Sequence, residues 1–345
     1  MKAYVLHGIA DLRYEETERP ILKEGTVLVA VRAAGICGSD IPRIYRTGAY
    51  SHPLIPGHEF AGVVEEIGPG ADAAWLHKRV GVFPMIPCME CPQCQKGQYE
   101  MCRRYNYLGS RTDGGFAEYV RVPSRNLLEL PENVTFEQAA MLEPMAVAMH
   151  AIRGIKAQPD ETVAVCGLGT IGLLIVMLLK SMGCKKVLTV GNKDIQRNAA
   201  LKMGVSPDEF CDMRIQSAEE WFQNTGRAVD VFFECVGRNE VLTEAIQCVA
   251  PGGRVMLVGN PASDMALDKN VYWQVLRKQL TLKGTWNSSF TGRADDDWHT
   301  VLQLLRDGRI HPEQLISHRF AMEELYRGME CMRDKSREYI KMIGV

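Results

Sequence analysis

The first part of the chain, up to about Glu143, consists of short apolar runs punctuated by glycine and proline. Thr26–Ala33 and Phe60–Glu66 are rich in β-branched residues and end at Gly or Pro, which predicts β-strands. Between Pro84 and Tyr105 the pattern gives way to a polar, cysteine-rich stretch without periodicity. A loop of that length normally needs an internal cross-link. The pattern therefore predicts a β-rich region with one long loop that is held together by an internal cross-link.

From about His150 the pattern changes to apolar strands that alternate with helices. The expected strands are Thr162–Cys166, Lys186–Val190, Val229–Glu234, Arg254–Val258 and Leu280–Lys283. An apolar helix is expected at Ile171–Met182 and a polar one at Asp194–Met203. This alternation predicts βαβ units around a parallel sheet. After about Trp286 a polar helical pattern returns, and Tyr339–Val345 is predicted to be a strand.

A chain of 345 residues is too long for one ordinary core and indicates two domains. We expect an α/β protein in which residues 1–149 and 287–345 form a β-rich domain. Residues 150–286 are expected to form a doubly wound parallel-sheet domain. No internal repeat or low-complexity tract is evident.

Composition and charge narrow the class of protein. The chain is 46% hydrophobic and 24% charged, and it contains no apolar run long enough to span a membrane. Its net charge of −2 disfavours a nucleic-acid surface or a polybasic membrane patch, so the expected partner is a small molecule. The first residues lack the features of a signal peptide, and the odd number of cysteines, 11, is typical of reduced thiols. We therefore expect a cytoplasmic protein.

A glycine motif follows the first strand of the parallel-sheet region and opens its apolar helix. It comprises Gly167, Gly169, Thr170, Ile171 and Gly172. In this context G-x-G-x-x-G predicts a dinucleotide site, because the glycines let backbone N–H groups approach a pyrophosphate at the helix N-terminus. The alternative is a tight strand-to-helix turn without a ligand.

The end of the second strand bears on the choice of cofactor. An NAD-binding fold usually places an acid there, whereas this chain has Gly191, followed by Asn192, Lys193 and, one turn later, Arg197. A small, cationic pocket favours a 2′-phosphate, so we predict NADP, with NAD as the alternative. In the latter case Lys193 and Arg197 form a solvated helix face while Asp194 caps the helix or contacts the ribose.

Two sets of residues are candidate metal ligands. The long loop contains Cys88, Cys91, Cys94 and Cys102 in the pattern C-x2-C-x2-C-x7-C, which predicts a closed, structural zinc site. An iron–sulfur cluster is disfavoured, because Arg rather than Pro follows the last cysteine. The second set is dispersed along the chain and comprises Cys37, His58 and Glu143. A thiolate, an imidazole and a carboxylate leave a fourth position open, as in catalytic zinc sites.

Together these motifs resemble the zinc-containing medium-chain dehydrogenase/reductase family, in its sorbitol-dehydrogenase-like branch. The resemblance covers essentially the whole chain and implies a GroES-like catalytic domain joined to a Rossmann domain. It implies that Cys37, His58 and Glu143 hold the catalytic zinc and that Glu59 is an alternate or water-mediated ligand. Val236 and Val258 complete the expected cofactor contacts. Runs around Cys37, Gly109–Tyr119 and Gly284–Ser289 are similar to galactitol-1-phosphate 5-dehydrogenases.

The implied chemistry is the reversible oxidation of a secondary alcohol of a polyol or sugar-alcohol phosphate to a ketone. Ser39 is the candidate proton relay, Glu59 a candidate base, and Asp40 is expected to fix the local turn. Other zinc-dependent secondary alcohol dehydrogenases, of the threonine or butanediol type, remain the alternative. Zinc-free relatives such as quinone reductases would lack the ligands that are present here. Candidate substrate contacts are Arg43, Arg46, Arg111, Tyr45, Tyr50, Trp286 and Asn287.

The family resemblance also implies a homodimer or homotetramer. In such an assembly the edge strand of the Rossmann sheet, at about Leu280–Lys283, is the expected contact.

Overall fold

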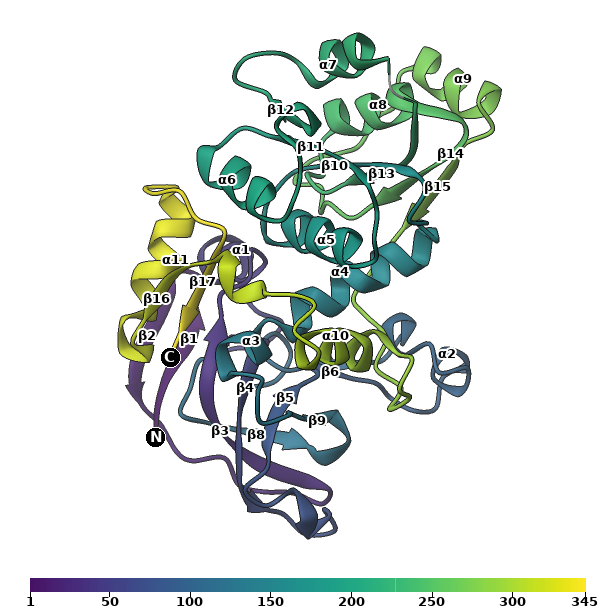
Figure 1. Ribbon diagram of the computed structural model, residues 1–345. Coiled ribbons are helices and arrows are strands. Elements are labelled where there is room, and N and C mark those ends of the chain that lie inside the picture. Colours follow the sequence, from purple (N-terminus) through teal and green to yellow (C-terminus); the bar gives the residue numbers. More distant parts are fainter. Residues whose placement is uncertain (227) are drawn as a thin grey trace. The chain divides into compact units, whose positions relative to one another are not determined.

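The computed structural model describes residues 1–226 and 228–345, which divide into two compact units (Figure 1). The β-rich unit comprises Met1–Glu143 and Ser289–Val345, and the parallel-sheet unit comprises Pro144–Ser288. The sequence analysis placed these boundaries at 149/150 and 286/287, whereas the two units meet at 143/144 and 288/289. The first boundary differs because one helix, α4 (Leu142–Ile155), begins in the β-rich unit and continues in the other, which no change in its apolar pattern reveals.

A seven-stranded sheet organises the β-rich unit, in the order β16-β17-β3-β4-β5-β9 with β8 paired to β3. Its strands are β3 (Thr26–Gly35), β4 (Glu59–Ile67), β5 (Arg79–Val82), β8 (Tyr119–Pro123), β9 (Leu127–Glu129), β16 (Ile316–Phe320) and β17 (Lys341–Gly344). The predicted strands at 26–33 and 60–66 are confirmed as β3 and β4. The predicted C-terminal strand is confirmed as β17, which pairs antiparallel with the end of β3.

Smaller elements complete this unit. Two short hairpins pair β1 (Lys2–Gly8) with β2 (Asp11–Glu16) and β6 (Met85–Ile86) with β7 (Asn106–Tyr107). Its helices are α1 (Asp40–Pro42), α2 (Pro92–Gln95), α3 (Phe136–Ala140), α10 (Asp297–Arg306) and α11 (Leu325–Asp334), and a π-helix, η1, covers Arg43–Thr47. Residues of β3, β4, β5 and α11 share one apolar core, which joins the two ends of the chain.

The parallel-sheet unit has the strand order β12-β11-β10-β13-β14-β15, and every pair is parallel. The strands are β10 (Thr162–Cys166), β11 (Lys186–Gly191), β12 (Phe210–Asp212), β13 (Val229–Glu234), β14 (Val249–Leu257) and β15 (Thr281–Gly284). The helices between them are α5 (Thr170–Ser181), α6 (Asp194–Lys202), α7 (Ala218–Thr225), α8 (Asn239–Cys248) and α9 (Lys269–Arg277). This is the doubly wound Rossmann order, so the predicted fold class is confirmed.

The strand order reverses between β10 and β13, which continue the sheet in opposite directions. In such sheets ligands bind beyond the carboxyl ends of the strands at this switch point. Helix α5 begins there, and its residues from Gly172 to Leu179 are all buried, which fixes its N-terminus next to β10.

Among the described residues, the search for membrane-crossing segments finds no helix with the necessary length and apolar character.

Candidate functional site

The turn after β3 presents Cys37 and Ser39. Asp40 is completely buried, and its Oδ2 accepts a hydrogen bond of 3.0 Å from the backbone N–H of Cys37. The guanidinium of Arg43 donates to Asp40 Oδ1 at 2.6 Å, so this arginine is committed to the turn. The Ser39 hydroxyl donates to Cys37 Sγ at 3.3 Å. Asp40 therefore fixes the turn, as expected, and holds the thiol beside the serine hydroxyl.

His58 and Glu59 stand at the start of β4, next to that turn. Their ligand atoms and Cys37 Sγ lie within 4.8 Å of one another, and both side chains are buried. His58 Nδ1 has no hydrogen-bond partner, although Asp40 Oδ1 lies 3.4 Å away. Burial opposes the charged imidazole, but the negative charges of Asp40 and Cys37 raise the pKa of His58 well above its ordinary value. The cluster is therefore one that favours a bound cation.

Lys341, on β17, enters the same cluster from the far end of the chain. Its ammonium group pairs with Glu59 Oε2 and donates to the carbonyl of Ile36 at 2.9 Å. Lys341 and Glu59 are each only 2% exposed. Gly35 leaves room for this pair, because a Cβ there would collide with both side chains. The sequence analysis missed Lys341; its one visible signal is a lone lysine within an apolar terminal strand.

Glu143 lies beside the cluster but outside the tight set of three. The hydroxyl of Tyr107 donates to Glu143 Oε1 at 3.1 Å, and the Tyr107 ring meets the His58 ring edge-on at 5.7 Å between centroids. Burial raises the pKa of Glu143 to about 7, with the charge of Glu59 adding to the effect and that of His58 opposing it. Tyr107, which links Glu143 to His58, is a second residue that sequence reasoning did not identify.

The chemistry of these donors fits a catalytic zinc ion. A thiol, an imidazole and two carboxyl groups are ligands that zinc accepts. Because Glu59 is shared with Lys341, one ligand position can remain open for water or substrate.

The four cysteines of the long loop form a separate cluster. The sulfur of Cys91 lies 3.5 Å from that of Cys94 and 3.9 Å from that of Cys102, and the Cys88 and Cys94 sulfurs are 4.0 Å apart. A tetrahedral zinc ion with Zn–S bonds of 2.3 Å separates its sulfurs by about 3.8 Å. All four cysteines are free of disulfide bonds. The spacing therefore fits a closed zinc site.

The loops beyond β10, β13 and β14 gather at one edge of the parallel-sheet unit. Gly167 has a φ of +96°, and a Cβ there would strike Val236. A Cβ on Gly172 would collide with the carbonyl of Gly167, so helix α5 packs closely on the turn. Gly169 is the N-cap residue of α5, and Thr170 and Ile171 begin the helix. Glu234, at the end of β13, accepts hydrogen bonds from the backbone of Val236 and Val258.

The residues that were predicted to set the choice of cofactor lie at and just after the end of β11. Gly191 is buried, and Asn192 donates its backbone N–H to Gln196 Oε1 at 3.1 Å. Lys193 is half-buried at the N-cap of α6, and Arg197 is exposed on that helix. Arg214, which the sequence analysis missed, donates to Asp194 and to Asp212 at 2.6 Å each. The turn thus holds three cations and two carboxylates.

The candidate substrate contacts do not gather into one group. Arg43 is bound to Asp40, Arg46 is exposed on η1, and Tyr45 stacks with Arg333 instead. Arg111 is held between Tyr50 and Tyr105. Trp286 and Asn287 belong to the other unit.

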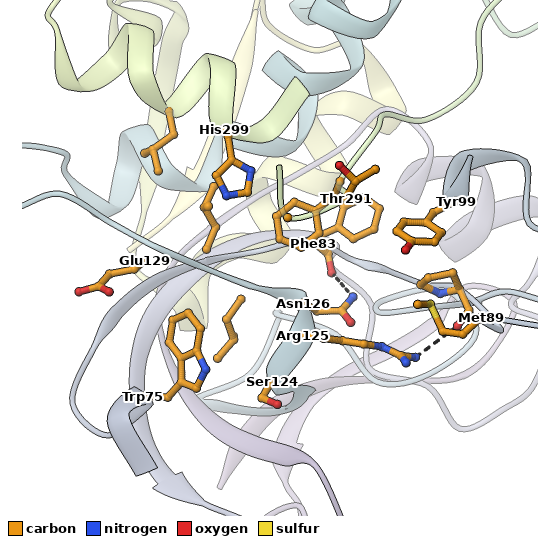
Figure 2. A pocket seen from close by; sticks show the side chains of 16 residues that line it. Trp75, Phe83, Met89, Tyr99, Ser124, Arg125, Asn126, Glu129, Thr291 and His299 are labelled. Carbon is orange, nitrogen blue, oxygen red and sulfur yellow. Dashed lines mark hydrogen bonds between the residues drawn. The ribbon is translucent and has the colours of Figure 1, made fainter. Parts of the chain in front are cut away.

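A hollow of about 730 Å³ opens elsewhere in the β-rich unit (Figure 2). Apolar side chains line much of it, among them Trp75, Phe83 and Phe290, and none of the predicted site residues does. Its polar groups serve the fold: Figure 2 shows that Asn126 and Arg125 hydrogen-bond to backbone carbonyls. The chemistry described above therefore lies outside this hollow.

Comparison with protein families gives two matches. Residues 23–132 match the alcohol dehydrogenase GroES-like domain, and residues 170–307 match the zinc-binding dehydrogenase family.

Individual relatives cover nearly the entire chain. Galactitol 1-phosphate 5-dehydrogenase of Escherichia coli K12 is 31% identical over 342 residues, which is 98% of this chain and 97% of the relative. L-idonate 5-dehydrogenase of Vitis vinifera is 32% identical over 334 residues, 94% and 88% of the two chains. An alcohol dehydrogenase from E. coli CFT073, solved in complex with NADH, superimposes with a TM-score of 0.91 at 29% identity, covering 100% and 99% of the chains.

Proposed function

We propose a function from one premise: the chain belongs to the zinc-containing medium-chain alcohol and polyol dehydrogenase family. The protein transfers hydride between a secondary alcohol of a polyol or sugar-alcohol phosphate and a nicotinamide cofactor, and the product is the ketose. The buried cluster of Cys37, His58 and Glu59, with Glu143 beside it, is the observation that carries this proposal.

Catalytic zinc would be held by Cys37, His58 and Glu143, with Glu59 as the alternate ligand. When bound, zinc supplies a Lewis acid for the substrate oxygen, and the nicotinamide accepts the hydride. Asp40 orients the imidazole and the thiol, in the manner of the carboxylate partners that support zinc ligands. Ser39 is the proposed proton relay, because its hydroxyl lies at the cluster and can both donate and accept.

A structural zinc ion would be held by Cys88, Cys91, Cys94 and Cys102. Hydrogen bonds from the backbone of Cys94 and Arg103 lower the pKa of Cys91 to about 6, whereas burial raises that of Cys94 to about 12. The four thiols therefore retain protons that zinc binding would release.

For the cofactor we propose NADP in preference to NAD. Gly191 offers no carboxylate to the ribose, and Lys193, Arg197 and Arg214 surround the strand end with positive charge. Asp194 and Asp212 neutralise part of that charge through Arg214.

The variant Gly191→Asp tests this preference. We expect the ratio of kcat/KM for NADP⁺ over NAD⁺ to fall about tenfold or more, because a carboxylate there binds the 2′-hydroxyl and repels a 2′-phosphate. An added Cβ lies 3.0 Å from Gln196 Oε1 and 3.1 Å from a methyl of Leu168, so Gly191→Ala is the matched control for crowding alone. It should affect both cofactors equally. A wild-type preference for NAD⁺, or an unchanged ratio in Gly191→Asp, contradicts the proposal.

Assembly into a homodimer or homotetramer is proposed through the edge of the parallel sheet. Within the described residues β15 pairs with β14 alone, and the neighbouring α9 exposes Tyr272, Trp273 and Leu276. Large exposed apolar side chains beside an open strand edge are typical of protein interfaces. A cytoplasmic location is proposed as well, since all 11 cysteines are free.

Steady-state assays of the zinc-loaded protein test the main proposal. Polyols and polyol phosphates are offered with NAD⁺ and NADP⁺, and elemental analysis accompanies the assays. We expect about two zinc ions per chain and turnover of at least one such substrate. Absence of zinc, or turnover of none of these substrates, overturns the assignment.

A further inference from the structure

Arg111 has surroundings unlike those of the other cations near the proposed metal cluster. Its guanidinium carbon lies 4.3 Å from the ring centre of Tyr50 and 4.2 Å from that of Tyr105, so the two rings sandwich it. Nη1 donates a long hydrogen bond of 3.4 Å to the carbonyl of Tyr105, and Nε is buried without a partner. In the part of the chain that the structure describes, no carboxylate pairs with Arg111.

The loop that carries Arg111 is fixed to the candidate active site. The backbone N–H of Arg111 donates to the carbonyl of Tyr107 at 2.9 Å, and Gly109 donates to Thr112 at 2.7 Å, which closes a tight loop. Gly109 packs against the backbone of Gly57, which precedes His58, with no room for a Cβ. Tyr107, at the start of the loop, contacts both His58 and Glu143. Arg111 is therefore held on a support that the metal cluster shares.

The other cationic side chains near the metal cluster either form ion pairs with buried carboxylates or are exposed to solvent. Arg43 neutralises the buried Asp40, and Lys341 neutralises the buried Glu59. Arg46 is exposed, and among residues 1–226 and 228–345 no aromatic ring stacks on it. Arg111 combines a partly buried side chain, a fixed orientation and an unmatched positive charge, the properties that an anion-binding group requires.

We propose that Arg111 is a specificity-determining residue that binds the anionic end of the substrate, a phosphate monoester or a carboxylate. The two tyrosine rings cover the faces of the guanidinium, so its terminal Nη groups remain to donate to an anion. The names of two relatives agree with this chemistry. Galactitol 1-phosphate and L-idonate each carry an anion at one end of the carbon chain, and both enzymes are 5-dehydrogenases. This inference rests on the proposed function.

The test compares galactitol, galactitol 1-phosphate and L-idonate as substrates of the wild type and of Arg111→Met. Methionine keeps an apolar side chain between the rings but removes the charge. For the preferred anionic substrate we expect kcat/KM to fall roughly 10- to 100-fold, mainly through KM, because charge-assisted hydrogen bonds are lost. For galactitol the change should stay below about threefold. The larger fall with galactitol 1-phosphate or with L-idonate identifies the anion as phosphate or carboxylate.

Two further variants keep the result interpretable. Arg111→Lys retains the charge without the planar fork and should recover part of the loss. Arg104→Met removes an exposed arginine that pairs with Glu90 on the zinc loop. This variant should leave kcat/KM for all three substrates unchanged. Should Arg111→Met misfold, the Arg111→Lys variant still reports a selective rise in KM for the anionic substrate.

The possible failures can be told apart. If the wild type oxidises galactitol but does not prefer an anionic substrate, or if Arg111→Met and Arg111→Lys slow all substrates equally, the role of Arg111 is wrong and the proposed function stands. If the wild type oxidises none of the three, the role of Arg111 is wrong, and the proposed function falls with it only when the full panel of polyols and polyol phosphates also gives no turnover.

Discussion

The two candidate metal centres of the β-rich unit are built in opposite ways. The four-cysteine cluster draws all its ligands from the stretch between Cys88 and Cys102. The other cluster collects Cys37 from the turn after β3, His58 and Glu59 from the entry into β4, and Glu143 from the start of α4. One site is local and uniform in its donors; the other depends on the tertiary fold.

The difference extends to the residues that support each set. A turn of helix α2 and backbone N–H groups suffice for the cysteines; for example, Cys88 donates to the Cys102 sulfur at 3.3 Å. The mixed cluster needs Asp40, Tyr107 and Lys341, each of which contacts at least one of the candidate ligands. Four equivalent thiolates leave no position for a substrate, whereas the mixed set can leave one open. Supporting contacts thus accompany the centre that is proposed to perform the chemistry, and variants can separate the two proposed roles.

The largest effect on activity is expected from Cys37→Ser. The substitution is nearly isosteric and leaves the Asp40 contact to the backbone in place, but it removes the thiolate ligand. Without the Lewis acid kcat should fall at least about 1,000-fold, and zinc content should fall from about two ions per chain to about one. The midpoint of thermal unfolding should change little. Retention of both zinc ions with more than a tenth of the activity contradicts the role assigned to Cys37.

Much of the fold could be predicted from the chain because it depends on local patterns. The strand at Thr162–Cys166 has the predicted bounds, and the helix expected at Ile171–Met182 spans Thr170–Ser181. The strand expected from Arg254 begins at Val249 instead, because the pairing of β13 with β14 shifts register between Val229 and Val231. Proline and paired glycines precede Arg254, and they concealed the first half of β14 in the sequence.

Candidate ligands could be named from the cysteine spacing and the family resemblance, but the residues that contact them could not. Lys341 lies 282 residues from Glu59 along the chain, and no spacing rule connects a terminal strand to a turn near the beginning. Tyr107 and Arg214 were missed for the same reason, since their roles arise from contacts made only in the folded chain.

An intermediate effect is expected from Lys341→Met, which leaves the buried carboxylate of Glu59 without its partner. Removing one member of a buried ion pair costs about 3–5 kcal/mol of the free energy of unfolding. Loss of such a supporting contact should also lower kcat by roughly 10- to 100-fold, because Glu59 is no longer held in place. Urea unfolding and steady-state assays measure the two quantities.

The double variant Glu59→Gln/Lys341→Met is the control for that experiment. It removes both charges, so it should recover much of the lost stability. If the single variant is as stable as the wild type, or if the double variant is less stable than the single one, then the pair does not have the structural role described.

The smallest effect on activity is expected from Cys94→Ser. Loss of the structural zinc should reduce the zinc content from about two ions per chain to about one, the same number as in Cys37→Ser. The kcat, however, should change by less than about threefold, because a closed site takes no part in the chemistry. The midpoint of thermal unfolding should fall instead, since metal binding stabilises a loop that has little core of its own. Met101→Ser is the matched control, because Met101 is exposed on the same loop and bears no ligand. Zinc analysis, calorimetry and activity assays at a temperature well below the unfolding transition separate the two centres. If Cys94→Ser loses as much activity as Cys37→Ser, then the two sites do not differ in role.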